Sequence, residues 1–137
     1  MKGIYCLFID VEDCSIDIGA KGKMDFPQGL YVYVGSAQNS IEKRITRHLS
    51  GDKKVRWHID YLLASEKARV VRIAYKEAPK EEECAAASAF AEDGIPIKGF
   101  GCSDCSCNSH LIRVDKIDTR GMKIYEKRYE KDCDSIR

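Results

Sequence analysis

The sequence predicts an α+β domain in which a mixed or antiparallel central sheet carries about three helices, packed mainly on one side. Two observations predict this class. Short segments rich in aromatic and β-branched residues are typical of strands, and other segments repeat their apolar residues at helical spacing. These segments follow one another in the order β-β-β-α-α-β-α-β-β, which is typical of an α+β fold. The length of 137 residues fits a single domain.

The first third of the chain supplies three predicted strands. Residues 3–11 form the first, and apolar and polar residues alternate over residues 15–19, which predicts a second strand paired to the first as a hairpin. Residues 20–29 contain glycines, a proline and charges, and this composition favours a loop. Residues 30–34 (LYVYV) then form the third strand.

Two helices are predicted next. Asn39 or Ser40 can accept hydrogen bonds from the free N–H groups at the start of the first helix. Its apolar stripe consists of Ile41, Ile45 and Leu49. Residues 57–64 (WHIDYLLA) predict a short second helix, in which the tryptophan either joins the core or stacks on nucleic-acid bases.

The remaining chain completes the predicted order. Residues 68–75 are typical of a strand, and a third helix begins after Pro79 with the sequence KEEECAAASAFAE. Residues 94–101 are predicted to be loop. Residues 111–117 and 122–129 are expected to pair with each other around a turn.

The predicted organisation is one domain over residues 1–137. Its core covers about 3–117, residues 12–29 form an added strand and loop, and residues 118–137 form a charged C-terminal hairpin and tail. The net charge of +1 creates no global attraction for a polyanion. Seven cysteines, no apolar run near 18 residues and no signal-peptide pattern predict reduced thiols and a cytoplasmic protein.

A basic segment extends from residue 41 to residue 56. Six basic residues stand there against two acidic ones, which suits a phosphate backbone and equally suits a solvated helix face. Arg44 and His48 are one helical turn apart and can address one ligand. The basic residues are Lys43, Arg44, Arg47, Lys53, Lys54 and Arg56, with His48 and His58 beside them.

Three glutamates open the third predicted helix. Glu81, Glu82 and Glu83 complement the helix dipole, and one carboxylate next to phosphate is enough to hold Mg²⁺. We favour Glu83 because it directly precedes the packing face at Cys84, although the choice among the three rests on helix phase.

Two tripeptides, Gly3-Ile4-Tyr5 and Tyr33-Val34-Gly35, stand on neighbouring predicted strands, and a helical arginine and a later helical glutamate follow them. This ordered set resembles the GIY-YIG nuclease family. The resemblance implies that Tyr5 and Tyr33 orient or deprotonate the attacking water, that Arg44 contacts phosphate, and that Glu83 binds Mg²⁺ or Mn²⁺. His48 is a candidate proton acceptor.

Longer motifs resemble one mostly archaeal branch grouped with GIY-YIG proteins, whose members are sometimes joined to an endonuclease III-type DNA glycosylase. The resemblance runs from Gly3 to about Leu111. The motifs are FPQGLYVYVGSA, RITRHL, WHIDYLL, EC followed by alanine, and FGCSDCSCNSHL. The two tyrosine motifs lie about 28 residues apart, farther than is usual in the family, and residues 12–29 account for the difference.

The expected function is therefore a metal-dependent nucleic-acid phosphodiesterase that acts on DNA rather than RNA, in repair or processing. The expected partner of the protein is nucleic acid, and a DNA glycosylase is a candidate protein partner. No membrane partner is expected. The alternative is a catalytically inactive nucleic-acid-binding module of the same fold. The residues expected to bind nucleic acid are Gly35, Ser36, Lys43, Arg47, Lys53, Lys54, Arg56 and His58.

A cysteine-rich segment, CSDCSCNSH, follows the third helix. Cys102, Cys105, Cys107 and His110 suggest a Zn²⁺ site, but structural zinc sites usually draw their ligands from two separated segments. The alternatives are a tight turn with buried thiols, thiol chemistry assisted by His110, or an approach of His110 to the tyrosine–arginine site. A zinc- or thiol-based regulatory domain is thus a third function class.

Overall fold

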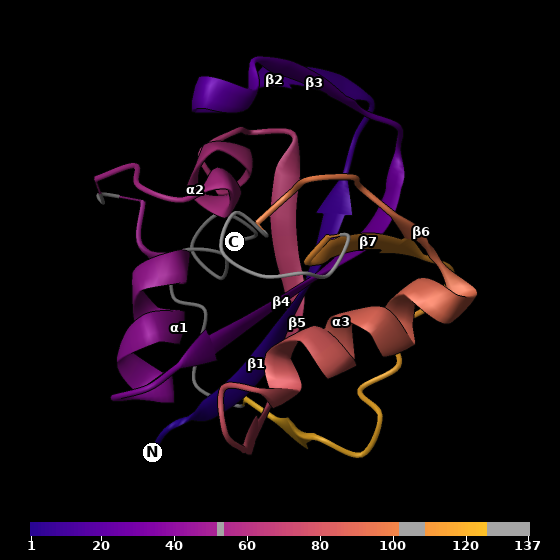
Figure 1. The fold of residues 1–137 in the computed structure, drawn as a ribbon. Coiled ribbons are helices and arrows are strands. Elements are labelled where there is room, and N and C mark those ends of the chain that lie inside the picture. Colours follow the sequence, from indigo (N-terminus) through magenta and orange to yellow (C-terminus); the bar gives the residue numbers. More distant parts are fainter. Residues whose placement is uncertain (52–53, 102–108, 126–137) are drawn as a thin grey trace, which may run out of the picture.

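The computed structural model describes residues 1–51, 54–101 and 109–125. Over these residues the fold is α+β, as predicted, with one six-stranded antiparallel sheet in the order β6-β7-β4-β1-β5-β8 (Figure 1). A separate two-stranded sheet, β2-β3, lies beside one end of it. The helices and strands are β1 (Gly3–Val11), β2 (Cys14–Asp17), η1 (Gly19–Lys21), β3 (Lys23–Phe26), β4 (Gly29–Ala37), α1 (Ile41–Leu49), α2 (His58–Leu63), β5 (Ala68–Glu77), α3 (Glu82–Asp93), β6 (Ile95–Pro96), β7 (Leu111–Val114) and β8 (Lys123–Ile124).

Strand β1 forms the centre of the sheet, between β4 and β5. Its side chains alternate between two apolar clusters, so that Tyr5 and Leu7 face one layer while Cys6 and Phe8 face the other. Both layers exclude water, and for this reason the sequence of the strand is a nearly continuous apolar run.

Helices cover both faces of the sheet. The buried side chains of α1 and α2, including Ile45 and Ile59, share a cluster with Tyr5. Helix α3 packs on the opposite face, where Phe90 meets Phe8 edge to face with ring centroids 6.1 Å apart. Figure 1 shows α1 and α2 on one side of the strands and α3 on the other. None of these helices has the length and apolarity required to cross a membrane.

The pairing predicted for the second strand is wrong. Strand β2 pairs with β3, within the segment expected to be loop, and not with β1. Residues 23–26 (KMDF) alternate polar and apolar side chains, and Phe26 is fully buried against the α1–α2 layer. Its burial offsets the loop-like composition around it, and the hairpin folds over α2 rather than extending the main sheet.

The predicted pairing of the last two strands is also wrong. Strand β7 pairs with β4 and β6, whereas β8 pairs with β5 at the other edge. The turn around Arg120 and Gly121 exists, with positive φ at both residues. The connection passes along the α3 face, where the Arg120 guanidinium lies 4.6 Å from the centroid of the Phe90 ring. Residues 126–129 lie outside the described residues.

Candidate active site

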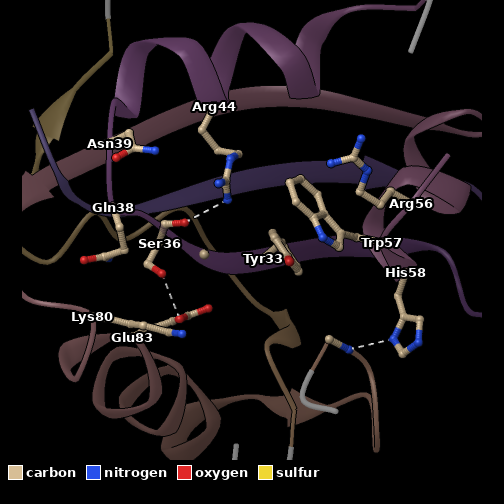
Figure 2. A pocket seen from close by; sticks show the side chains of 12 residues that line it. Tyr33, Ser36, Gln38, Asn39, Arg44, Arg56, Trp57, His58, Lys80 and Glu83 are labelled. Carbon is tan, nitrogen blue, oxygen red and sulfur yellow. Dashed lines mark hydrogen bonds between the residues drawn. The ribbon is translucent and has the colours of Figure 1, made fainter. Parts of the chain in front are cut away.

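A pocket of about 490 Å³ opens where β4 continues beyond its β7 partner (Figure 2). Strand β7 pairs with β4 only at Leu30–Tyr33, so the last residues of β4 lie past that ladder. Helix α1 approaches this end of β4 from one face of the sheet and α3 from the other. The lining residues are Tyr33, Gly35, Ser36, Gln38, Asn39, Arg44, Arg56, Trp57, His58, Lys80, Glu83 and Gly101.

Ser36 connects the two faces. Arg44 Nη1 donates to the Ser36 carbonyl oxygen at 3.0 Å, from the α1 side. The Ser36 hydroxyl donates to Glu83 Oε1 at 3.0 Å, on the α3 side. Successive side chains of a strand point to opposite faces, and Tyr33 accordingly lies in the α1 layer while Ser36 turns toward α3. A cation and a carboxylate thus stand on either side of one residue, beside Tyr33 (Figure 2).

Tyr5 lies behind the pocket wall. It is 1% exposed, and its hydroxyl is 2.7 Å from His48 Nε2. Its ring crosses the backbone of Gly35, where a Cβ would overlap the Tyr5 hydroxyl. Gly35 is one of the residues expected to bind nucleic acid. The structure gives it a second duty, which is to make room for Tyr5.

Burial keeps both tyrosines protonated. Loss of hydration raises the pKa of Tyr5 well above its usual range, and the nearby Arg44 charge only partly opposes this. Burial likewise raises the pKa of Tyr33, and the nearby Tyr5 and Glu83 raise it further. Near neutral pH both phenols therefore offer hydroxyl groups rather than phenolates. The tautomer of His48 decides which of the two groups donates in the contact between His48 Nε2 and the Tyr5 hydroxyl.

Arg47 is held by α2. Its two terminal nitrogens donate to the two oxygens of Asp60, each at 3.0 Å, and Asp60 is fully buried. Burial acts to raise the pKa of Asp60, but the Arg47 hydrogen bonds and the backbone N–H groups of Trp57 and Arg56 outweigh it and lower the pKa. Arg47 therefore fixes the junction of α1 and α2 rather than facing the pocket.

Trp57 lies between the core and the pocket, and its stacking on nucleic-acid bases stays a prediction. It packs against the apolar cluster of the α1 layer and also forms part of the pocket wall. Arg44 and Arg47 lie over its ring, at 4.7 and 4.2 Å from the centroid. These cation–π contacts orient the Arg44 guanidinium toward β4.

The other residues expected to bind nucleic acid divide into two groups. Gly35, Ser36, Arg56 and His58 line the pocket, and His58 Nδ1 accepts a hydrogen bond from the Gly101 N–H at 2.9 Å. Burial, aided by the Lys21 charge, lowers the pKa of His58. Lys43 and Lys54 are exposed and lie off the pocket wall. Lys53 lies outside the described residues.

Glu83 is the one of the three glutamates that lines the pocket. Glu81 is exposed, and Glu82 pairs with Lys76 at 3.1 Å. Glu83 Oε2 is 3.1 Å from His110 Nδ1, and its side chain is 16% exposed. His110 thus lies next to this site. This agrees with one of the predicted alternatives, in which His110 approaches the tyrosine–arginine site.

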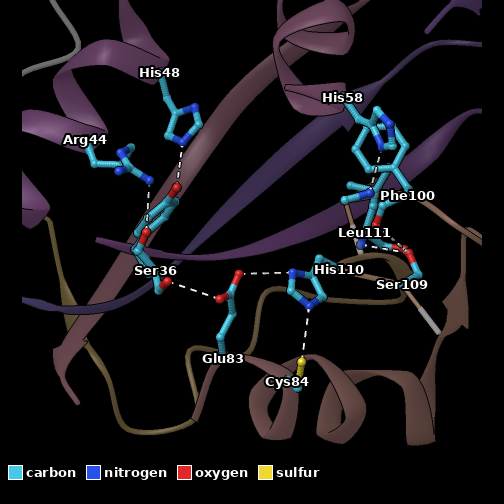
Figure 3. A network of polar contacts seen from close by, with 12 residues as sticks. Ser36, Arg44, His48, His58, Glu83, Cys84, Phe100, Ser109, His110 and Leu111 are labelled. Atoms are coloured by element: carbon cyan, nitrogen blue, oxygen red, sulfur yellow. Dashed lines mark hydrogen bonds and ion pairs between the residues drawn. The ribbon is translucent and has the colours of Figure 1, made fainter. Parts of the chain in front are cut away.

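His110 stands between two partners on α3 (Figure 3). Its Nδ1 faces Glu83, and its Nε2 is 3.6 Å from Cys84 Sγ. Burial acts to lower the pKa of His110, but the hydrogen bonds to Glu83 and Cys84 and the nearby negative charge outweigh it and raise the pKa. Cys102, Cys105 and Cys107, the other expected zinc ligands, lie outside the described residues.

The pocket residues fit a hard divalent cation better than a multi-ligand metal centre. Among the described residues no three His, Cys, Asp or Glu side chains converge as metal ligands. Mg²⁺ needs only one or two protein carboxylates, because it keeps several waters and takes phosphate oxygens. Glu83, with the Ser36 hydroxyl beside it, provides this kind of donor set.

Sequence reasoning missed several pocket residues. Gln38 and Asn39 belong to the turn between β4 and α1, and Lys80 precedes α3. The position of Lys80, three residues before Glu83, was a usable signal, because a single turn joins the two residues and the Glu83 N–H donates to the Lys80 carbonyl oxygen at 3.0 Å. Asp60 carried no signal, because its partner Arg47 is recognisable only when the two helices are packed together.

A family model described as "Domain of unknown function DUF123" matches residues 4–131. The chain belongs to this family. The DUF123 match contains β4, α1 and α3, and therefore the elements that bring Arg44, Ser36 and Glu83 together. Neither a curated protein nor a solved structure is significantly similar to the chain.

Proposed function

We propose that this DUF123 protein is a metal-dependent nucleic-acid phosphodiesterase of the GIY-YIG type, in its mostly archaeal branch, and that it acts on DNA. One observation carries the proposal. Arg44 and Glu83 approach Ser36 from opposite faces of the sheet, in a pocket whose wall includes Tyr33. The ordered tyrosine, arginine and glutamate motifs in the sequence support the same conclusion.

Arg44 has the role of stabilising charge on phosphate. Its guanidinium lines the pocket, and its orientation is fixed by the Ser36 carbonyl and the Trp57 ring. A prepositioned guanidinium stabilises the negative charge that develops on the phosphate oxygens during in-line attack, because it needs no reorganisation at that moment.

Tyr33 and the buried Tyr5–His48 pair have different roles in the proposed site. The Tyr33 side chain reaches the pocket and orients the water, while Tyr5 contacts His48 Nε2. Because both phenols stay protonated, Tyr33 acts on the water as a hydroxyl group, whereas Tyr5, which lies behind the pocket wall, supports the site from within the core.

Glu83 would hold the divalent cation, with the Ser36 hydroxyl beside it. When bound, Mg²⁺ or Mn²⁺ neutralises negative charge on the phosphate undergoing attack. His110 stabilises Glu83 in the orientation that this requires, through its contact with Oε2.

A cleavage screen tests the proposal. Branched, flapped, abasic and single-stranded DNA are incubated with the protein and Mg²⁺ or Mn²⁺. We expect metal-dependent cuts that fall by about 10²-fold or more in Arg44→Ala and in Glu83→Gln, because each removes a group that stabilises the transition state. Arg69→Ala and Glu81→Gln are matched controls, since both side chains are exposed and lie off the pocket.

Unchanged cleavage in both site variants would refute the proposal. The rival function is a non-catalytic nucleic-acid-binding module, and one observation favours it: both Glu83 oxygens already have protein partners, Ser36 and His110. The rival predicts salt-dependent DNA binding that Glu83→Gln preserves or strengthens, and no cuts with either metal.

A further inference from the structure

A row of basic side chains runs through the pocket and continues beyond it. Within the pocket, Lys80 and Arg56 lie on opposite sides of Arg44 (Figure 2). His58 is at the same end as Arg56. Lys21, on η1 of the β2–β3 hairpin, does not line the pocket, but it lies close enough for its charge to act on His58. The row therefore leads out of the pocket toward this hairpin.

The turn that carries Lys21 is fixed against α2. Ile18 is fully buried in the apolar cluster that contains the buried side chains of α1 and α2. Gly19 follows with positive φ, and a Cβ there would overlap the Tyr61 hydroxyl on α2. The Gly22 N–H closes the turn on the Gly19 carbonyl at 2.9 Å. The backbone of Lys21 is thus held in place, while its side chain is exposed.

The Lys21 ammonium group lies over the loop that borders the pocket. Gly99 has positive φ, and a Cβ on it would overlap this ammonium group. Two residues further along, Gly101 lines the pocket and donates its N–H to His58 Nδ1 at 2.9 Å. The loop that contains Gly99 and Gly101 therefore connects the hairpin to the rim of the pocket.

The positive charge at this end of the pocket comes from Lys21 and Arg56 rather than from His58. Burial and the Lys21 charge lower the pKa of His58, so its ring is neutral near neutral pH. Because Nδ1 accepts the Gly101 N–H, the ring proton is on Nε2. A neutral hydrogen-bond donor thus accompanies two cations, and all three are groups that contact phosphate oxygens.

No carboxylate pairs with these two cations in the part of the chain that the structure describes. Lys67, Lys76 and Arg120 each form an ion pair with a carboxylate. Over the same described residues, Lys21 and Arg56 form none. Cations that gather on one surface without carboxylate partners attract a polyanion, because its phosphates neutralise them and release counterions.

We propose that the β2–β3 hairpin extends the path of the nucleic acid, and that Lys21 contacts a phosphate outside the pocket, past Arg56 and His58. This inference rests on the proposed function, because the strand that reaches Lys21 is the one whose reacting phosphate lies between Arg44 and Glu83. The substrate must then continue past the cut site on this side. Lysine and arginine contacts to phosphate carry no sequence information, so the hairpin selects strand length rather than sequence.

The salt dependence of DNA binding tests Lys21. Fluorescence anisotropy measures the binding of a labelled single strand of about 12 nucleotides, a length within the range that such binding sites cover. We expect Lys21→Ala to reduce the slope of log K against log salt by about 0.7, because one phosphate contact is lost. Lys21→Arg keeps the charge and should keep the slope.

Two further variants sharpen this measurement. Lys23→Ala is the matched control in the same hairpin, because Lys23 is exposed and stands opposite Asp17 in the β2–β3 ladder. Its slope should equal that of the unmodified protein. Arg56→Ala combined with Lys21→Ala should reduce the slope by about 1.4, because the two cations contact different phosphates. Equal losses in Lys21→Ala and Lys23→Ala would overturn the inference.

Cleavage kinetics separate this inference from the proposed function. Lys21 does not touch the reacting phosphate, so Lys21→Ala should raise KM and leave kcat unchanged, whereas Arg44→Ala should lower kcat. When the strand is shortened past the Lys21 contact, Lys21→Ala should no longer change KM. Unchanged slope and KM in Lys21→Ala, with cleavage by the unmodified protein, would overturn the inference alone. Absence of both DNA binding and cleavage in the unmodified protein would overturn the proposed function as well.

Discussion

Two glycines explain how neighbouring strands can bring tyrosines together. A Cβ on Gly3 would overlap the carbonyl oxygen of Lys76 on β5, and a Cβ on Gly35 would overlap the hydroxyl of Tyr5. The first glycine lets β1 lie against its neighbour, and the second lets the Tyr5 ring cross β4 and reach His48. Both glycines are therefore required by packing, whatever the pocket binds.

Gly35→Ala tests this requirement. The added methyl group displaces Tyr5 from His48, and overpacking in a rigid layer costs about 1–3 kcal/mol. We expect the free energy of unfolding in urea to fall by that amount, and cleavage to fall with it. Gly51→Ala is the control, because a Cβ there meets nothing within 4 Å. Equal effects of the two changes would refute the packing argument.

The sequence predicted the chemical types at the site better than their contacts. Helix phase favours Glu83 among the three glutamates, and Glu83 is the one that lines the pocket. The contact of Tyr5 with His48 joins residues 43 positions apart. No local pattern encodes such a pair, and the roles assigned to these residues stay predictions.

At the scale of elements, the junction of α1 and α2 depends on one buried carboxylate. Asp60 accepts hydrogen bonds from Arg47 and from the backbone N–H groups of Arg56 and Trp57. It thereby caps α2, fastens that helix to α1, and keeps the Trp57 ring under the Arg44 guanidinium. Removal of a carboxylate with these partners strongly destabilises the folded protein.

Asp60→Asn should therefore lower stability by about 2–5 kcal/mol at neutral pH, where the carboxylate is charged. Because the pKa of Asp60 is lower in the folded protein, its contribution is present above the unfolded pKa of about 3.9 and is lost as the pH falls through the folded pKa. The stability difference between the two proteins, measured by urea unfolding, should shrink below about pH 4. A difference independent of pH would contradict the assignment.

Sequence periodicity predicted which elements exist better than which strands pair. The alternation over residues 15–19 does correspond to a strand. The strand that pairs with it, residues 23–26, was not predicted because the residues around it have a loop-like composition. Residues 111–117 and 122–129 looked like a hairpin because a turn joins them. Pairing is decided by which strand offers a complementary apolar face, and β7 and β8 lie on opposite sides of the central strand β1.

At the scale of the molecule, the net charge of +1 conceals a local concentration of cations. Arg44, Arg56 and Lys80 line one pocket from three different segments of the chain. Interactions with a polyanion depend on such a patch rather than on the total charge, because salt screens charges beyond about 10 Å at 0.1 M. Nucleic acid bound there should release counterions.

Lys80→Ala tests whether nucleic acid occupies the pocket. Binding of DNA is measured by fluorescence anisotropy at several salt concentrations. Loss of one phosphate contact should reduce the slope of log K against log salt by about 0.9 for duplex DNA. Lys123→Ala, on β8 at the far edge of the sheet, should leave the slope unchanged. Equal slopes for both variants would place the DNA elsewhere on the surface.

At the end of β4, the face of the sheet on which a side chain lies depends on whether its position is odd or even. Tyr33 and Gly35 face the α1 layer and Ser36 faces α3, so the two halves of the site are distinguished only by whether a position is odd or even. Removing one residue between Tyr33 and Ser36 would exchange the two faces for every later position of the strand. Removing two would restore them. In this protein the number of residues between the tyrosine and the serine therefore matters to the site as much as their identities do.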